Sequence, residues 1–285
     1  MKRRMYIAVL ALLLASTHLF AQAPTRYTLS EGDTFTATSV VDQNIEQSLF
    51  GQTMTTTQNI ISVDIYEVVA VTAQGYRLKT TGISRKLDTT SPQGTISMDS
   101  EKEGDDNLAF RALSGKTYFI DMDHTGKVIS MDGVTELKDA VRAELAGTAL
   151  ESVAESLLDA YSETTLFNSF EGLFHIYPEA GNTSLNRQEE MVINNLPIFM
   201  DISFKPEGAN SIVADGTLTM LGDINVGGVP MTADMKGTQT STFSINAANG
   251  MSTKIETIQD MEGELQVQGT SVPMTLKTKV TVTIE

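Results

Sequence analysis

Long runs of strict alternation between apolar and polar residues constrain this chain more than any other feature. In the last run, Val272, Met274, Leu276, Val280, Val282 and Ile284 share one side, and threonines and lysines share the other. This period of two residues predicts strands with one buried and one wet face. The same pattern occurs at 196–204, at 212–220, and near the start at Phe35, Ala37 and Val41, followed by Ile61, Val63 and Ile65.

Turn signals separate these runs, among them Gly51-Gln52, Gln74-Gly75, Ser91 to Gly94 and Asn249-Gly250. The Asn-Gly pair favours a tight hairpin, because both central residues of a type I′ turn need a positive φ. Strands joined by hairpins are antiparallel, and long antiparallel strands must coil. We therefore expect a mainly β (α+β) fold, a long curved antiparallel sheet or partial barrel made of two β-meander halves.

Between the halves the period changes to 3.6 residues, which is typical of amphipathic helices. Apolar positions predict one helix over 134–145, with Thr135 as a possible N-cap, a second over 150–161, and a third short one over 166–174. We expect these helices to pack on the sheet. The predicted layout is a single domain at 22–285, with a β-meander at 22–132, a helical block at 133–177 and a second β-meander at 178–285.

The first residues have the order of a cleaved secretory signal, with Lys2, Arg3 and Arg4 ahead of an apolar run at 6–15 that is too short to span a bilayer. Cleavage after Ala21 or after Ala23 fits, and Ala21 is favoured because the other site would leave Pro24 first. Without cysteine, no lipid can be attached there. The prediction is a signal peptide at 1–21 and a periplasmic or secreted protein that is not a lipoprotein.

The net charge of the chain limits the classes of partner that it can bind. Removing the leader takes three of the 20 basic residues and none of the 36 acidic ones, which changes the net charge from −16 to −19. Such a surface repels phosphate backbones and anionic headgroups, so nucleic acid is not expected as a partner. No transmembrane segment is expected in the processed chain, and the absence of cysteine excludes disulfides and thiol catalysis.

Several segments resemble a family of exported β-rich proteins of the Bacteroidota that has no established activity. The resemblance is carried by 29–35, 43–58, 91–107, 121–128 and 170–178. The resemblance implies an exported protein with a β-rich fold, and it implies no chemical activity. In that family the Tyr-Pro pair tends to be followed by a Gly-Asp-Ser-Trp-like turn, whereas 182–189 departs from it and the chain has no tryptophan. The outline is also loosely similar to that of the periplasmic lipoprotein carriers.

Catalytic chemistry has little support in the sequence. After the leader only His124 and His175 remain, and we interpret the first as a residue of a hairpin tip and the second as a packed or capping residue at a helix end. We expect no enzyme and no cofactor. A weak calcium candidate is the loop with Asp121, Asp123, Thr125 and Asp132 at calcium-loop spacing; aspartate in place of the bidentate glutamate and the flanking strands argue against it.

The remaining candidate functional residues are apolar. Methionines recur in the β segments, where core filling is the default and a ligand surface the alternative. The candidate ligand contacts are Leu150, Leu157, Tyr161, Met231 and Met274. The sequence thus favours two functions over a third, a hydrolase that uses a pair of carboxylates. One is a binding protein that holds an apolar ligand or a protein segment, and the other is a structural or envelope-interaction protein without a pocket.

Overall fold

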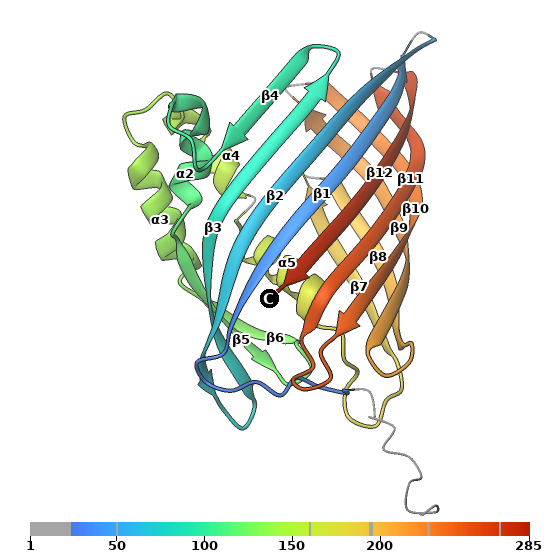
Figure 1. Ribbon diagram of the computed structural model, residues 1–285. Helices are drawn as coiled ribbons and strands as arrows, with labels where there is room; N and C mark the ends of the chain where they lie inside the picture. The colour runs from blue at the N-terminus through green and yellow to red at the C-terminus, as the bar shows by residue number, and fades with distance from the viewer. Residues whose placement is uncertain (1–23, 50, 160, 194–195, 227–228, 268) are drawn as a thin grey trace, which may run out of the picture.

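The structure is a computed structural model, and it describes residues 24–49, 51–159, 161–193, 196–226, 229–267 and 269–285. The predicted signal peptide at 1–21 lies outside these ranges. Within them the chain forms one antiparallel sheet of 12 strands with short helices packed on it, as the alternation predicts (Figure 1).

The sheet runs in the order β6-β5-β3-β2-β1-β12-β11-β10-β9-β8-β7, with β4 paired to β3 beside this path. The strands are β1 (Thr34–Leu49), β2 (Gln52–Val71), β3 (Gly75–Ser91), β4 (Gly94–Asp99), β5 (Thr117–Asp123), β6 (Val128–Asp132), β7 (Leu185–Ile193), β8 (Leu196–Pro206), β9 (Ser211–Val226), β10 (Val229–Ile245), β11 (Ser252–Val267) and β12 (Thr270–Ile284). The first and last strands pair along eleven positions from Ala37↔Ile284 to Gln47↔Met274. This pairing joins the two meanders into one curved wall (Figure 1).

The inner face of this wall is the one that carries the core. On β12 and β8 the predicted alternation is right, since Val282, Ile202 and Phe204 are buried. On β2 it is wrong. Asp64 pairs with Ala37 and Tyr66 with Phe35, so the even-numbered residues of β2 face inward, while Ile61, Val63 and Ile65 lie on the outer face. Both faces of this strand are partly apolar, and alternation alone therefore could not choose between them.

The helices are η1 (Asp105–Asn107), α2 (Leu108–Leu113), α3 (Val134–Leu145), η2 (Glu151–Val153), α4 (Ala154–Asp159) and α5 (Glu163–Phe174). The helix predicted over 134–145 is α3, although Gly133, with a φ of 83°, occupies its N-cap in place of Thr135. The helix predicted over 150–161 is shorter, because Ser162 accepts a hydrogen bond from the Thr165 amide and caps α5 instead. In the described ranges, no helix has the length and apolarity that crossing a bilayer requires.

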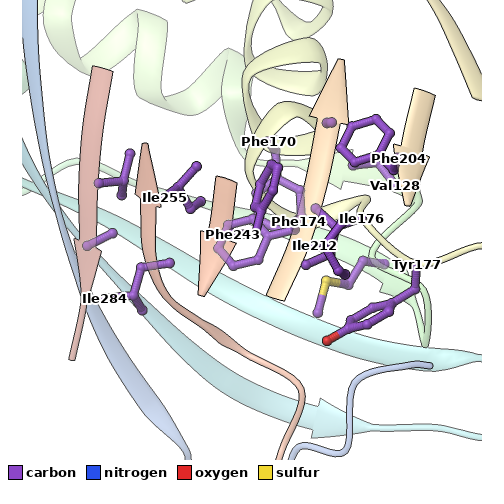
Figure 2. Close-up of a cluster of buried hydrophobic side chains, with 14 of the residues drawn as sticks. Val128, Phe170, Phe174, Ile176, Tyr177, Phe204, Ile212, Phe243, Ile255 and Ile284 are labelled. Carbon is purple, nitrogen blue, oxygen red and sulfur yellow. The ribbon is translucent and has the colours of Figure 1, made fainter. Parts of the chain in front are cut away.

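The helices do not cover the sheet as one block. Among the described helices, α5 alone packs into the main core, where its Phe170 and Phe174 (Figure 2) are stacked with their centroids 4.3 Å apart. Tyr66 of β2 meets Phe174 edge-on at 5.1 Å. Helices α2, α3 and α4 form a second, smaller cluster around Leu113, Val141 and Leu158. The helices therefore pack on the sheet as expected, with α5 over the main core and α2 and α3 against β3 and β5.

The Asn-Gly signal marks a turn but no two-residue hairpin. β10 ends at Ile245 and β11 begins at Ser252, so the connection is longer than predicted. The extra residues hold neighbouring segments: the Asn249 carbonyl accepts the Thr28 amide at 2.9 Å, and the Gly250 carbonyl accepts the Tyr177 hydroxyl at 2.6 Å. Tertiary contacts thus set the length of this loop.

A cavity between sheet and helices

A cavity of about 370 Å³ lies between the inner face of the sheet and the helices. The strands β1, β2, β3 and β12 supply one side, and α5 with parts of α2, α3 and Tyr161 supplies the other. Its apolar wall consists of Ala37, Leu113, Leu137, Leu166, Phe170, Leu173, Val280 and Val282. Pockets of this size and composition are the usual sites for small apolar ligands.

A partly buried ion pair lies in the same cavity. Arg85 Nη2 of β3 donates to Asp64 Oδ1 of β2 at 2.5 Å, and each side chain is only 20% exposed. Arg85 Nη1 also donates to the carbonyls of Val63 at 3.0 Å and Ser84 at 2.8 Å. The guanidinium is therefore held by the backbone as well as by the carboxylate.

A β-bulge positions this pair. Val63 pairs with Ser84 but Asp64 pairs with Gly82, which leaves Ile83 as an extra, exposed residue. Bulges re-aim side chains and take backbone groups out of the ladder. Here the Arg85 guanidinium donates to the two carbonyls at the bulge, and Gly82 has no side chain to cover the pair. A Cβ on Gly82 would lie 3.4 Å from Arg85 Nη2.

Hydroxyl groups complete the polar end of the cavity. Ser39 and Ser62 face each other across β1 and β2, and Tyr66, Tyr118 and Tyr161 also line the space. Burial, and then the nearby Asp64 carboxylate, raise the pKa of Tyr66 and of Tyr118, so both phenols remain protonated donors. Burial also raises the pKa of Asp64 against the opposing effect of Arg85. The cavity thus combines an apolar wall with a compact set of donors and acceptors.

Of the candidate ligand contacts, Tyr161 lines this cavity. Leu150 lines a separate groove of about 830 Å³ between β4 and α2. Met231 and Met274 are half-buried on β10 and β12, and Met274 borders an open hollow of about 1090 Å³ whose other lining residues are mostly polar or charged. The side chain of Leu157 is outside the described part of the structure. Sequence reasoning missed Asp64 and Arg85, because they are 21 positions apart and only the hairpin register joins them.

The calcium candidates have other partners. Arg77 donates to Asp121 at 2.8 Å and to Asp132 at 2.7 Å, so a guanidinium lies between these two carboxylates. Asp123 Oδ1 accepts the Thr125 amide, the Thr125 hydroxyl and the Lys127 amide, which fixes the β5–β6 turn. Within the described ranges, no three carboxylate or histidine side chains gather in a way that could hold a metal ion.

Both histidines lie where the sequence predicts. His124 stands in the β5–β6 turn with Nδ1 at 2.9 Å from the Tyr76 hydroxyl, and His175 is the buried C-cap of α5. Arg187 donates to the carbonyls of Glu171 and His175, at 2.7 and 2.8 Å, and pairs with Glu189 at 2.6 Å. Burial lowers the pKa of Arg187 and raises that of Glu189. This cluster anchors the end of α5 to β7.

Comparison with known proteins places the chain in a family. Residues 73–252 match the model of DUF6263, a family of unknown function. The chain belongs to this family. The match begins just before β3 and ends at the start of β11, so it includes Arg85 and all the helices but not Asp64. No curated protein sequence matches the chain.

Among solved structures, the chain is similar to one described as "lipid-protein interactions in lipovitellin", with a TM-score of 0.52 and 7% identity. The similarity covers 90% of this chain and 25% of that one, so the chain spans about a quarter of the larger protein. At this identity the likeness shows a shared sheet fold. An outer membrane channel from Pseudomonas putida F1 has 9% identity over 91% of this chain and 98% of its own, with a TM-score of only 0.30.

Proposed function

We propose that this protein is an exported, non-enzymatic binding protein that holds an apolar or amphipathic small molecule between α5 and the inner face of its sheet. The cavity of about 370 Å³ carries this proposal. At about 30 Å³ for each water-sized group, it has room for about a dozen such groups, which suits one medium-length chain. A structural protein without a pocket would fill this space with side chains.

Two further observations support the proposal. The solved structure with the similar sheet is described as one of lipid–protein interactions in lipovitellin, and an open sheet whose inner face is covered by a helix suits the same class of ligand. The predicted leader at 1–21 supports export, with Gln22 as the first residue of the processed chain. Export is tested by N-terminal sequencing of protein recovered from the periplasm and from the medium.

Binding is tested with N-phenyl-1-naphthylamine, a neutral apolar probe that fluoresces when it leaves water. In Ser62→Phe, a ring would project from β2 into the cavity, so we expect the affinity for the probe to fall at least tenfold. The matched control is Thr57→Phe, which places the same ring on the exposed outer face of the same strand. We expect the control to bind as the original protein does.

Native mass spectrometry of the protein purified from its own periplasm identifies what the cavity carries. We expect a co-purifying small molecule that Ser62→Phe loses and Thr57→Phe keeps. Equal probe binding by both variants would contradict the proposed site, and no binding by the original protein would contradict the function. Retention of a peptide in place of a small molecule would show that the occupant is a protein segment.

A further inference from the structure

The polar end of the cavity restricts which amphiphile fits, and this inference rests on the proposed binding function. The two cations that line the cavity are both paired: Arg85 with Asp64, and Lys116 with Glu144. The site therefore has no unpaired positive charge among its described lining residues. A ligand with an anionic head would enter a neutral site next to a carboxylate, and would lose its hydration there without a counter-ion.

Asp64 also determines the kind of hydrogen bond that the head must make. Its Oδ1 accepts Arg85, whereas the described residues provide no donor to Oδ2. Asp64 lines the cavity and its side chain is only partly exposed, so this second oxygen can accept a hydrogen bond from a donor on the ligand. Around it, the hydroxyls of Ser39, Ser62 and Tyr66 have no hydrogen-bond partner within the described residues, and each can both donate and accept.

A head that both donates and accepts, and carries no net charge, satisfies all of these groups. We infer that the cavity binds a medium-chain amphiphile with a neutral, hydroxylated head, of the class of the monoacylglycerols. The volume limits the chain. About a dozen water-sized groups accommodate a glycerol head with only part of a long acyl chain, and the rung next to Val280 on the inner face is polar, with Gln43 Nε2 donating to Thr278 Oγ1 at 3.3 Å.

Three ligands that share one chain and differ only in the head test this inference. Monodecanoylglycerol, decanoic acid and decylamine are each titrated at pH 7 against bound N-phenyl-1-naphthylamine, below the concentrations at which they form micelles. We expect monodecanoylglycerol to displace the probe at least tenfold more tightly than decanoic acid. Equal or tighter binding of decanoic acid would overturn the inference. Preferential binding of decylamine would overturn it too, because Asp64 would then recognise a cation.

Asp64→Asn reverses the expected selectivity. The substitution leaves the Arg85 guanidinium without its counter-ion, so decanoic acid should gain at least tenfold in affinity while monodecanoylglycerol changes less. Asp88→Asn makes the same change of charge on the outer face of β3, where Asp88 pairs with Lys86, and should leave both affinities unchanged. Selectivity that Asp64→Asn leaves unaltered would contradict the role assigned to this carboxylate.

A second variant keeps the inference testable if Asp64→Asn does not fold. Ser39→Ala combined with Ser62→Ala removes two hydroxyls and adds no bulk. We expect weaker binding of monodecanoylglycerol by several-fold and unchanged binding of the apolar probe. If neither the original protein nor any variant binds the probe, the proposed function itself is refuted. Failure of the inference about the head group is therefore distinguishable from failure of the proposed function.

Discussion

Gly126 allows the β5–β6 turn to lie directly against the end of α5, and its replacement by alanine tests this contact. Gly126 lies in the β5–β6 turn with a φ of 91°. A Cβ built there would lie 1.9 Å from the Phe174 carbonyl oxygen and 2.8 Å from the Tyr27 ring. The same carbonyl accepts the Tyr27 hydroxyl at 2.7 Å. The turn, the end of α5 and the N-terminal segment therefore meet at one point.

The expected loss of stability is the sum of three separate effects. A left-handed φ costs about 1 kcal/mol for a non-glycine residue. Overlap with a backbone oxygen adds about 1–3 kcal/mol, and displacing the carbonyl from Tyr27 loses a hydrogen bond worth about 1 kcal/mol. We therefore expect Gly126→Ala to lower the free energy of unfolding by about 3–5 kcal/mol.

Gly32→Ala is the matched control. Gly32 has a φ of 89°, and a Cβ there would meet nothing within 4 Å, so only the backbone effect of about 1 kcal/mol applies. Both variants are unfolded in urea and followed by circular dichroism. A difference between them of less than about 1 kcal/mol would refute the reasoning, because the contact with Phe174 would then contribute nothing beyond the backbone conformation.

Three further substitutions follow from the structure. Phe170→Ala, which removes a ring only 3% exposed, should destabilise the fold by about 3–5 kcal/mol in urea unfolding, and a loss below about 1 kcal/mol would show that α5 is not anchored there. Arg187→Met leaves Glu189 buried without its cation and should cost about 3–5 kcal/mol, most of which the double variant with Glu189→Leu recovers. Because the pKa of Asp64 is raised by burial, its ionisation opposes folding: stability is lost as the pH rises from about 4, the unfolded value, through the folded pKa. Asp64→Asn should lack this decline when urea unfolding is compared across that window, and identical pH profiles would contradict it.

The alternation of apolar residues predicts most of the sheet because it reports which side of a strand is dry. On β12 one side is apolar and the other is threonine and lysine, and the prediction is right. On β2 it fails, since Ile60 and Ile61 are neighbours on opposite faces and the inner face carries Ser62 and Asp64. Polar residues on an inner face are unfavourable for packing. A rule based on apolarity assigns such residues to the solvent-facing side of the strand, so it misses the polar lining of the cavity.

The cavity itself was beyond prediction from the sequence. Asp64 and Arg85 meet through the register of a hairpin that contains a one-residue bulge at Ile83, and a shift of one residue would place Arg85 on the outer face. The 3.6-residue period predicts α3 and α5 correctly, but it does not determine which element a helix packs against. Helices α2, α3 and α4 bury apolar side chains against one another, whereas Phe170 and Phe174 of α5 pack into the main core on the sheet.

The methionines show why the cavity lies at the helix end of the curved sheet. Met235 and Met261 are 1% and 6% exposed. Gly237 and Gly263 alternate with them on neighbouring strands, and a Cβ on either glycine would lie within 2.2 Å of a backbone oxygen of the next strand. The sheet therefore coils tightly enough there to fill its own inner side with thioethers, which adapt to irregular space. Near α5 the inner face carries Ser39, Ser62 and Ala37 instead, and these small side chains leave the gap beneath the helix that becomes the cavity.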